Sequence, residues 1–166
     1  MKKRACALVL VLALVGVSVG ANWELLRLTT GVTAVYSLWQ TSPRRFADQT
    51  YWGGVGVEAL YRSISFGAAV TLADLETFRI TDDPSFDVAV SFTFLRSGPA
   101  GLRLRAGSVV SPRHSWVSAY LSLRAFWDAL PFTTVHVWFG YQAVVAGASG
   151  ANIFLGAGTS LYLPLL

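Results

Sequence analysis

Seven titratable side chains are spaced along the sequence so that they could act together. Among them, guanidinium groups outnumber carboxylates. The seven side chains are those of Arg27, Glu58, Asp87, Arg103, Arg105, Arg124 and His136. Guanidinium–carboxylate pairs neutralise buried charge, whereas unpaired guanidinium groups attract anions. Two interpretations are therefore open at this point. The seven groups either form a salt-bridged plug inside the protein or line an anion-preferring pore.

Nucleophilic catalysis receives little support from the sequence. His114 and Ser115 are adjacent, so within a strand they would point to opposite faces, and we expect both in a loop. His136 has no serine partner that the sequence can place. The glycine patterns GVGVE and GAGTS lack the lysine of a phosphate loop, and no cluster has metal-ligand spacing. We expect no catalytic, cofactor-binding or metal site, and no enzymatic activity.

The elements that position the charges are predicted from strict alternation. In the stretch GLRLRAGSVV (101–110), apolar residues at 102, 104 and 106 alternate with Arg103, Arg105 and Gly107. A period of two is typical of a strand with one wet and one dry face. Eight segments alternate in this way, with lengths near the 9–11 residues of a tilted membrane-crossing strand. They are 26–38, 51–61, 64–72, 86–94, 101–110, 116–127, 133–145 and 153–163.

The two faces of these segments differ in charge and in bulk. One face is large and apolar and carries no Asp, Glu, Lys, Arg or His, while the other carries the seven titratable groups among Gly, Ser, Thr and Ala. A lipocalin-like barrel would turn the dry face inward, and a membrane barrel would turn it outward. An eight-stranded barrel has room inside only for its own side chains. The small, charged face therefore belongs inside, which predicts an all-β, eight-stranded antiparallel up-and-down transmembrane barrel.

Aromatic residues fall on both faces. At strand ends on the dry face, Tyr36, Tyr51, Tyr61, Phe94 and Trp127 would form interfacial girdles. Aromatic side chains on the charged face would help to block the lumen, which favours the plug over the pore. With the glycines supplying room, they could instead hold a small apolar ligand. These lumen aromatics are Trp116, Tyr120, Trp138, Phe154 and Tyr162.

The N-terminal residues 1–21 have the pattern of a signal peptide. Three basic residues precede an apolar run that is short for a membrane-spanning helix, and small residues follow it. We expect cleavage that leaves 22–166 as the barrel, with an uncleaved anchor helix as the alternative. Beyond the three N-terminal basic residues the chain carries ten basic and nine acidic residues, which excludes a nucleic-acid-binding surface. The sole cysteine, Cys6, lies within the leader, so no disulfide is expected.

The lengths of the turns and loops predict how the barrel is oriented in the membrane. A tight turn is expected near Arg62 and longer loops at 41–49 and 74–85, with both termini on the periplasmic side. Residues 137–166 contain no charge and could be read as a membrane helix. The sequence GASGAN interrupts that stretch, and period-two alternation flanks it, so strands are the favoured interpretation.

The alternation over the whole of 22–166 resembles the small eight-stranded outer-membrane proteins of the OmpA, OmpX and OmpW type. The likeness is architectural, and the C-terminal SLYLPLL departs from the terminal aromatic residue common in that group. The resemblance implies a location in the bacterial outer membrane, with outer-membrane lipids and the barrel-assembly machinery as partners. It implies a structural or surface-interaction role, with porin-like or OmpW-like passage or binding of small solutes as the alternative. A lipid A-modifying enzyme is the third and least favoured.

Overall fold

The structure is a computed structural model, and the residues that it describes are 25–41, 49–74, 79–80, 84–112, 115–147 and 149–165. Only the backbone is described at 25, 49–52, 73–74 and 79–80. The predicted signal peptide, residues 1–21, lies outside these ranges. The strands are β1 (Leu25–Gln40), β2 (Gln49–Tyr61), β3 (Ile64–Asp74), β4 (Arg79–Ile80), β5 (Phe86–Ser97), β6 (Ala100–Ser111), β7 (Trp116–Leu130), β8 (Thr133–Ala146) and β9 (Ala151–Pro164).

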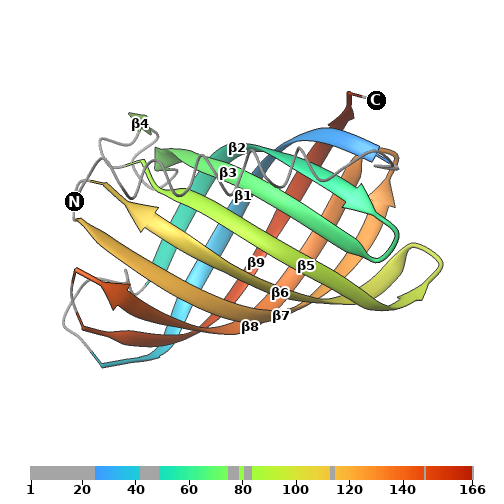
Figure 1. Cartoon of the computed structure of the whole chain (residues 1–166). Coiled ribbons are helices and arrows are strands. Elements are labelled where there is room, and N and C mark those ends of the chain that lie inside the picture. The colour runs from blue at the N-terminus through green and yellow to red at the C-terminus, as the bar shows by residue number, and fades with distance from the viewer. Residues whose placement is uncertain are drawn as a thin grey trace.

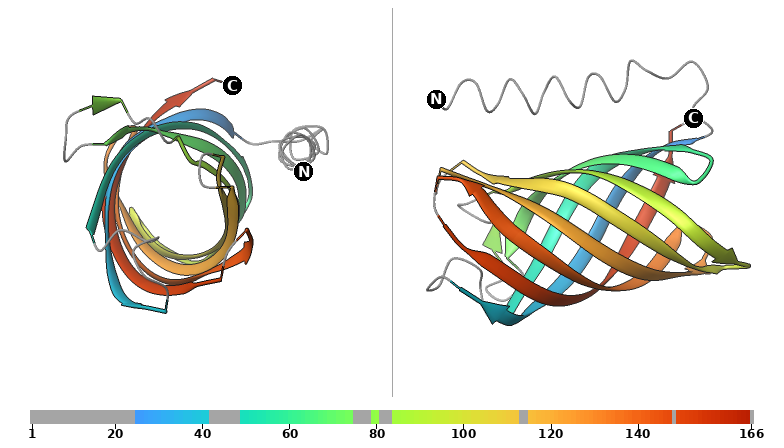
Figure 2. Two further views of the ribbon diagram at one scale, coloured as in Figure 1. Left: turned by 90° about the vertical axis from the view of Figure 1, so that its left-hand side faces the viewer. Right: turned by 60° about the horizontal axis from the view of Figure 1, so that its bottom comes forward.

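Eight of these strands close into a single antiparallel barrel (Figure 1). Each long strand pairs with the next along the chain, β3 pairs with β5, and β1 pairs with β9 to complete the ring. The end-on view in Figure 2 shows the strands enclosing one lumen. This arrangement confirms the predicted fold class. Closure leaves no strand of the ring with an unpaired edge, which a lipid environment requires.

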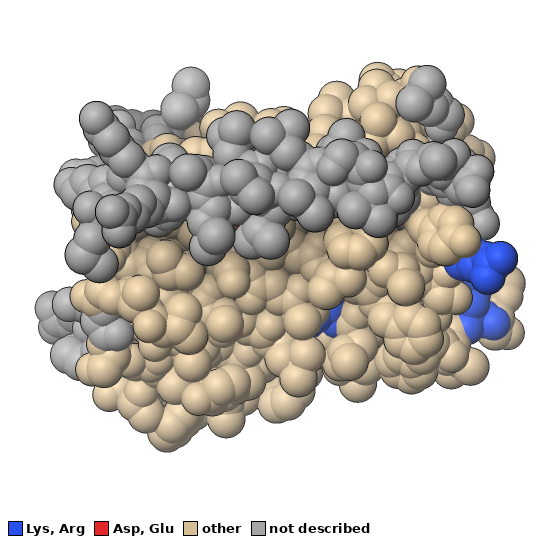
Figure 3. Space-filling view, viewed as in Figure 1, with Lys and Arg blue, Asp and Glu red and all other residues tan. Residues whose placement is uncertain are grey.

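The apolar face lies outside and the charged face inside. Along β8 the outward Val137 and Phe139 are about half exposed, while the intervening Trp138 is 6% exposed. The side chains of Arg27, Arg103 and Arg105 are 12%, 17% and 16% exposed. Figure 3 shows an exterior without acidic side chains over the described part of this face, with basic side chains mainly at one end. The soluble, lipocalin-like alternative would require the opposite sorting.

The strands are strongly staggered around the ring. Following the residue pairs from Leu26 leads back to β1 at Trp39, thirteen positions further along the chain. A large stagger goes with strongly tilted strands and a wider barrel at a given strand number. Figures 1 and 2 show this tilt. The lumen can therefore hold long side chains and still retain free space.

Two bulges explain why strands β1 and β5 are longer than the sequence predicted. The register shifts between Ser37 and Trp39 in β1 and between Thr93 and Leu95 in β5. A bulge breaks the alternation, so consecutive residues can share a face. Leu38 and Trp39 are accordingly 53% and 51% exposed. The predicted strand ends at Leu38 and Phe94 mark these bulges, and pairing continues beyond them.

The two ends of the barrel differ in their connections. Two-residue turns follow β2, β5 and β7, and the longer connections lie at the opposite end. Arg62, Gly98 and Phe132 adopt positive φ in these turns. Gly98 takes this conformation without steric penalty directly before Pro99. The Leu165 amide donates to the Leu26 carbonyl at the turn end, so both described ends of the chain lie there, as predicted.

The structure departs from two sequence-based interpretations, in the segments 74–85 and 137–166. The region 74–85 was predicted as a plain loop, but it contains β4, which pairs with the end of β3. This pairing is too short to leave a periodic signal in the sequence. The stretch 137–166 forms most of β8 and all of β9, so the helical alternative is wrong. In the described part of the chain, no helix has the length and hydropathy needed to cross a membrane.

Candidate functional site

Glu58 connects opposite sides of the lumen. It lies on β2 directly opposite Arg27 of β1, whose Nη2 and Nε donate to its Oε2 at 2.6 and 3.0 Å. Arg103 lies on β6, three strands from β2 and four strands from β1 around the ring, and approaches Oε1 at 3.4 Å. Its Nε also donates to Thr93 Oγ1 at 3.1 Å. One carboxylate thus neutralises guanidinium groups that come from opposite walls of the barrel.

Asp87 belongs to a second cluster, built on the successive strands β5, β6 and β7. Arg105 Nη2 donates to Asp87 Oδ2 at 2.6 Å, and Arg105 Nε donates to the Tyr120 hydroxyl at 2.7 Å. The same hydroxyl donates to Asp87 Oδ1 at 2.8 Å. The three side chains therefore close a triangle of hydrogen bonds. Such a cluster fixes the orientation of each member, because moving one breaks two bonds.

Aromatic rings cover the arginines. The guanidinium carbon of Arg27 lies 3.7 Å from the ring centroid of Tyr162, and that of Arg103 lies 5.1 Å from the centroid of Phe126. Arg124 lies over Trp138 at 4.6 Å. These distances are in the range of cation–π attraction. The rings thus stabilise charge that the two lumen carboxylates do not fully neutralise.

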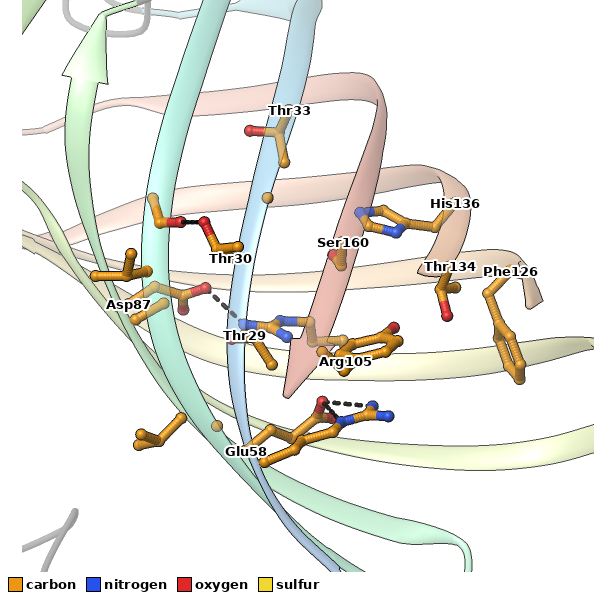
Figure 4. A pocket seen from close by; sticks show the side chains of 18 of the residues that line it. Thr29, Thr30, Thr33, Glu58, Asp87, Arg105, Phe126, Thr134, His136 and Ser160 are labelled. Carbon is orange, nitrogen blue, oxygen red and sulfur yellow. Dashed lines mark hydrogen bonds and ion pairs between the residues drawn. The ribbon is translucent and has the colours of Figure 1, made fainter. Parts of the chain in front are cut away.

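His136 lies on β8, one inward position before Trp138. Its ring centroid is 5.1 Å from that of Trp138, and its residue surface is 4% exposed. Figure 4 shows its side chain near Ser160 and Thr134. It lines the same space as Arg124, and no ion pair joins it to a carboxylate among the described residues.

Inward aromatic rings of the barrel lie over glycines of the neighbouring strand. Phe154 faces Gly140 directly across β8 and β9, and Trp138 faces Gly156 in the same strand pair. A Cβ added to Gly140 would come within 2.6 Å of Phe154 Cζ, and one added to Gly156 would collide with the Trp138 ring. The glycines therefore provide the space in which the rings lie flat against the wall.

A cavity of about 420 Å³ remains beside these side chains. One side of it, here called the small-residue wall, is formed by inward residues of β1–β3. These are Thr29, Gly31, Thr33, Gly54, Gly67, Ala69 and Thr71. The opposite wall of the barrel, here called the aromatic wall, carries the inward aromatic residues of β7–β9 other than Trp116 near the loop end. These are Tyr120, Phe126, Trp138, Phe154 and Tyr162, of which Phe126 and Tyr162 line the cavity. Figure 4 shows residues of both sides around the cavity.

The structure places all seven predicted titratable residues in the lumen, and it joins five of them in ion pairs. Arg124 and His136 remain outside these pairs. The predicted lumen aromatics Tyr120, Trp138, Phe154 and Tyr162 lie on inward faces, as does Trp116 near the loop end. Of the girdle residues, Tyr36, Tyr61, Phe94 and Trp127 are exposed, whereas the side chain of Tyr51 lies outside the described residues.

Sequence reasoning missed several lumen residues. Phe126 is 7% exposed and shares the inward face of Arg124, so continued alternation would have found it. Arg96 and Asp128 form an ion pair at 3.0 Å at the turn end, and the Thr134 hydroxyl also donates to Asp128. The bulge at Thr93/Leu95 hid Arg96, because the alternation changes phase there, and Asp128 lies one residue beyond the predicted segment 116–127.

The adjacent residues His114 and Ser115 are only partly described by the structure. His114 lies outside the described residues, and Ser115 is an exposed turn residue with a φ of 56°. No group of His, Cys, Asp and Glu within the described ranges could hold a metal ion. The lumen instead offers fixed positive charge, aromatic faces and hydroxyl groups, which are the components of a binding site or a plug.

Comparison with known proteins finds likeness in fold. The solution structure of the de novo designed TMB2.3 matches with a TM-score of 0.54 and 15% identity, over 82% of this chain and 93% of that chain. The crystal structure of Neisserial surface protein A (NspA) matches with a TM-score of 0.49 and 10% identity, over 82% and 96% of the two chains. No protein-family model and no curated protein matches the sequence. The fold and the lumen together define a closed, eight-stranded antiparallel barrel that is apolar outside and charged inside.

Proposed function

We propose that the protein is an integral β-barrel of the bacterial outer membrane with a structural or surface-interaction role. The observation that carries the proposal is the inversion of polarity, with half-exposed Leu, Val, Phe and Trp outside and ion-paired arginines inside. An arginine on the lipid face near the midplane costs roughly 2–4 kcal/mol, which accounts for the uncharged exterior. The predicted leader at 1–21 would direct export, and the barrel-assembly machinery would insert the chain.

The proposed role further includes a lumen that is closed to free diffusion. Glu58 links Arg27 and Arg103 across the barrel, and the Asp87–Arg105–Tyr120 triangle fills the adjoining space. Both clusters use groups fixed by two or more contacts, so opening the lumen would require breaking several charge-assisted hydrogen bonds. This feature supports a plug over a pore, in a protein of the OmpA, OmpX and OmpW type without enzymatic activity.

Membrane fractionation and planar-bilayer recording test the proposal. The protein should fractionate with outer membranes and migrate differently on a gel before and after heating, because closed barrels resist unfolding by detergent. In planar bilayers the refolded protein should give no reproducible unitary conductance. Recovery in the soluble periplasmic fraction would overturn the membrane assignment, and regular channels would overturn the closed lumen.

A second candidate function is passage or binding of small solutes, and the cavity of about 420 Å³ favours it. Charge-removing changes at Arg103 and Arg105 distinguish the two. If conductance or ligand binding changes while the barrel still folds, the lumen is functional. If the barrel fails to fold, the charge clusters are structural.

A further inference from the structure

Arg124 is the arginine for which the lumen provides no carboxylate partner among the described residues. Glu58 pairs with Arg27 and Arg103, Asp87 pairs with Arg105, and Asp128 pairs with Arg96 at the turn end. Arg124 stacks on Trp138, and its buried Nε has no hydrogen-bond partner in the described part of the chain. Buried donors are rarely left unsatisfied in proteins, so such a group indicates a missing acceptor.

The charge balance of the deep lumen points to the same conclusion. Four arginines (Arg27, Arg103, Arg105 and Arg124) face two carboxylates (Glu58 and Asp87) within the described strands. Three of these arginines already share both carboxylates. The remaining positive charge lies in a space shielded by the barrel wall, where electrostatic attraction is stronger than in water. An anion that enters this space would meet an uncompensated guanidinium group.

The cavity beside Arg124 has suitable volume and donors for such an anion. Arg124, His136 and Ser160 all line it, and Figure 4 shows His136 and Ser160 directed into the same region. A guanidinium fork, a hydroxyl and an imidazole nitrogen together match the oxygen atoms of phosphate or a carboxylate. A volume of about 420 Å³ accommodates an anion of this size together with hydrating water.

We propose that the lumen contains a binding site for a small oxyanion, of the phosphate or carboxylate class, centred on Arg124. The guanidinium group binds the anion by charge-assisted hydrogen bonds, and Ser160 and His136 supply further donors. The flat indole of Trp138 holds the guanidinium plane in place. The proposed anion site is compatible with a closed lumen and with a conducting one. A finding of channel activity would therefore not contradict it.

Calorimetric titration of the refolded barrel with inorganic phosphate, in detergent micelles at constant ionic strength, tests this site. The wild-type protein should bind one phosphate saturably. Arg124→Gln should weaken binding by about tenfold to a hundredfold, as expected for loss of a charge-assisted pair. Arg62→Gln is the matched control, because it removes the same charge from the exterior turn, and it should bind as the wild type does. Equal affinity in Arg124→Gln, or no saturable binding by the wild type, would overturn the proposal.

Nuclear magnetic resonance keeps the proposal testable if Arg124→Gln does not fold. The Nε–H resonance of Arg124, identified by its loss in Arg124→Lys, should shift saturably as phosphate is added, and potassium chloride at equal ionic strength should not reproduce the shift. Resistance to urea gives an independent readout. Phosphate should raise the urea midpoint of the wild type and of Arg62→Gln but not that of Arg124→Gln. A resonance unmoved by phosphate would contradict the site.

Discussion

The small-residue wall and the aromatic wall of the lumen are packed differently. Next to the cavity, the inward residues of β1–β3 other than Arg27 and Glu58 are mainly Gly, Ala and Thr. On β7–β9 the inward residues include large rings, and glycines of the neighbouring strand provide the space that the rings occupy. Gly67 therefore has room for a Cβ beside it on one wall, whereas Gly140 and Gly156 permit close packing of rings on the other.

The difference between the walls shows how the lumen is filled. The side chain of Arg103 on β6 extends across the lumen to β2, where Glu58 accepts from its guanidinium group. If both walls carried large residues, the interior of an eight-stranded barrel would be overfilled. If both walls carried small ones, the buried charges would lose their partners. Changes at four points of the lumen test this contrast, and the expected loss of stability decreases from Glu58 to Arg96.

Glu58→Gln should have the largest effect, because it leaves Arg27 and Arg103 buried without their shared carboxylate. Removing one partner of a buried ion pair typically costs about 3–5 kcal/mol. Urea unfolding of the barrel in lipid vesicles measures this loss. Asp128→Asn is the control, since its side chain is 35% exposed at the turn end. A Glu58→Gln barrel as stable as the wild type would show that the walls do not depend on this link.

Alanine substitutions of glycine should distinguish the two walls directly. Gly156→Ala places a methyl group against the Trp138 ring and should destabilise the barrel by about 1–3 kcal/mol, as overpacking does. Gly67→Ala places its methyl group 3.7 Å from the nearest atom and should change stability by about 0.5 kcal/mol or less. Equal losses in the two variants would contradict the proposed division between the walls. Urea midpoints in vesicles provide the measurement.

Tyr120→Phe tests the triangle that joins β5, β6 and β7. The change removes the hydroxyl that accepts from Arg105 and donates to Asp87, at an expected cost of about 1–2 kcal/mol. Tyr141→Phe, on the outward face, is the matched control and should be close to neutral. The urea unfolding midpoints of both variants, measured under the same conditions, give the two losses of stability to be compared. A larger loss in Tyr141→Phe would mean that the triangle contributes little.

Arg96→Gln should have the smallest effect of the four. Its side chain is 61% exposed, and its pair with Asp128 lies at the mouth of the barrel. Exposed ion pairs contribute about 0–1 kcal/mol and are screened by salt. The loss should therefore be small at low ionic strength and vanish at high ionic strength. A loss comparable with that of Glu58→Gln would place this pair among the structural elements of the lumen.

Much of the fold followed from alternation, because burial on one face of a strand imposes a period of two. The stretch 101–110 already showed which residues share a face, and the structure keeps that assignment from Arg103 to Val109. The same rule failed at Ser37/Trp39 and Thr93/Leu95, where bulges change the phase. Arg96, and with it the pair Arg96–Asp128, was missed for this reason. The short β4 was missed because two residues carry no periodicity.

By itself the sequence determined that the chain forms eight alternating strands with the charges of the predicted segments on one face. The face on which a side chain lies depends only on its position within its own strand, and not on which strands pair. It also determined that this face carries mainly small side chains, which fit the narrow interior of an eight-stranded barrel. Which charges meet was decided only by the tertiary structure. Glu58 pairs with Arg103 because ring closure and stagger bring β2 and β6 within reach across the lumen. The same geometry leaves Arg124 beside the cavity without a carboxylate as its ion-pair partner among the described residues, since ion pairing depends on distances that no single strand encodes.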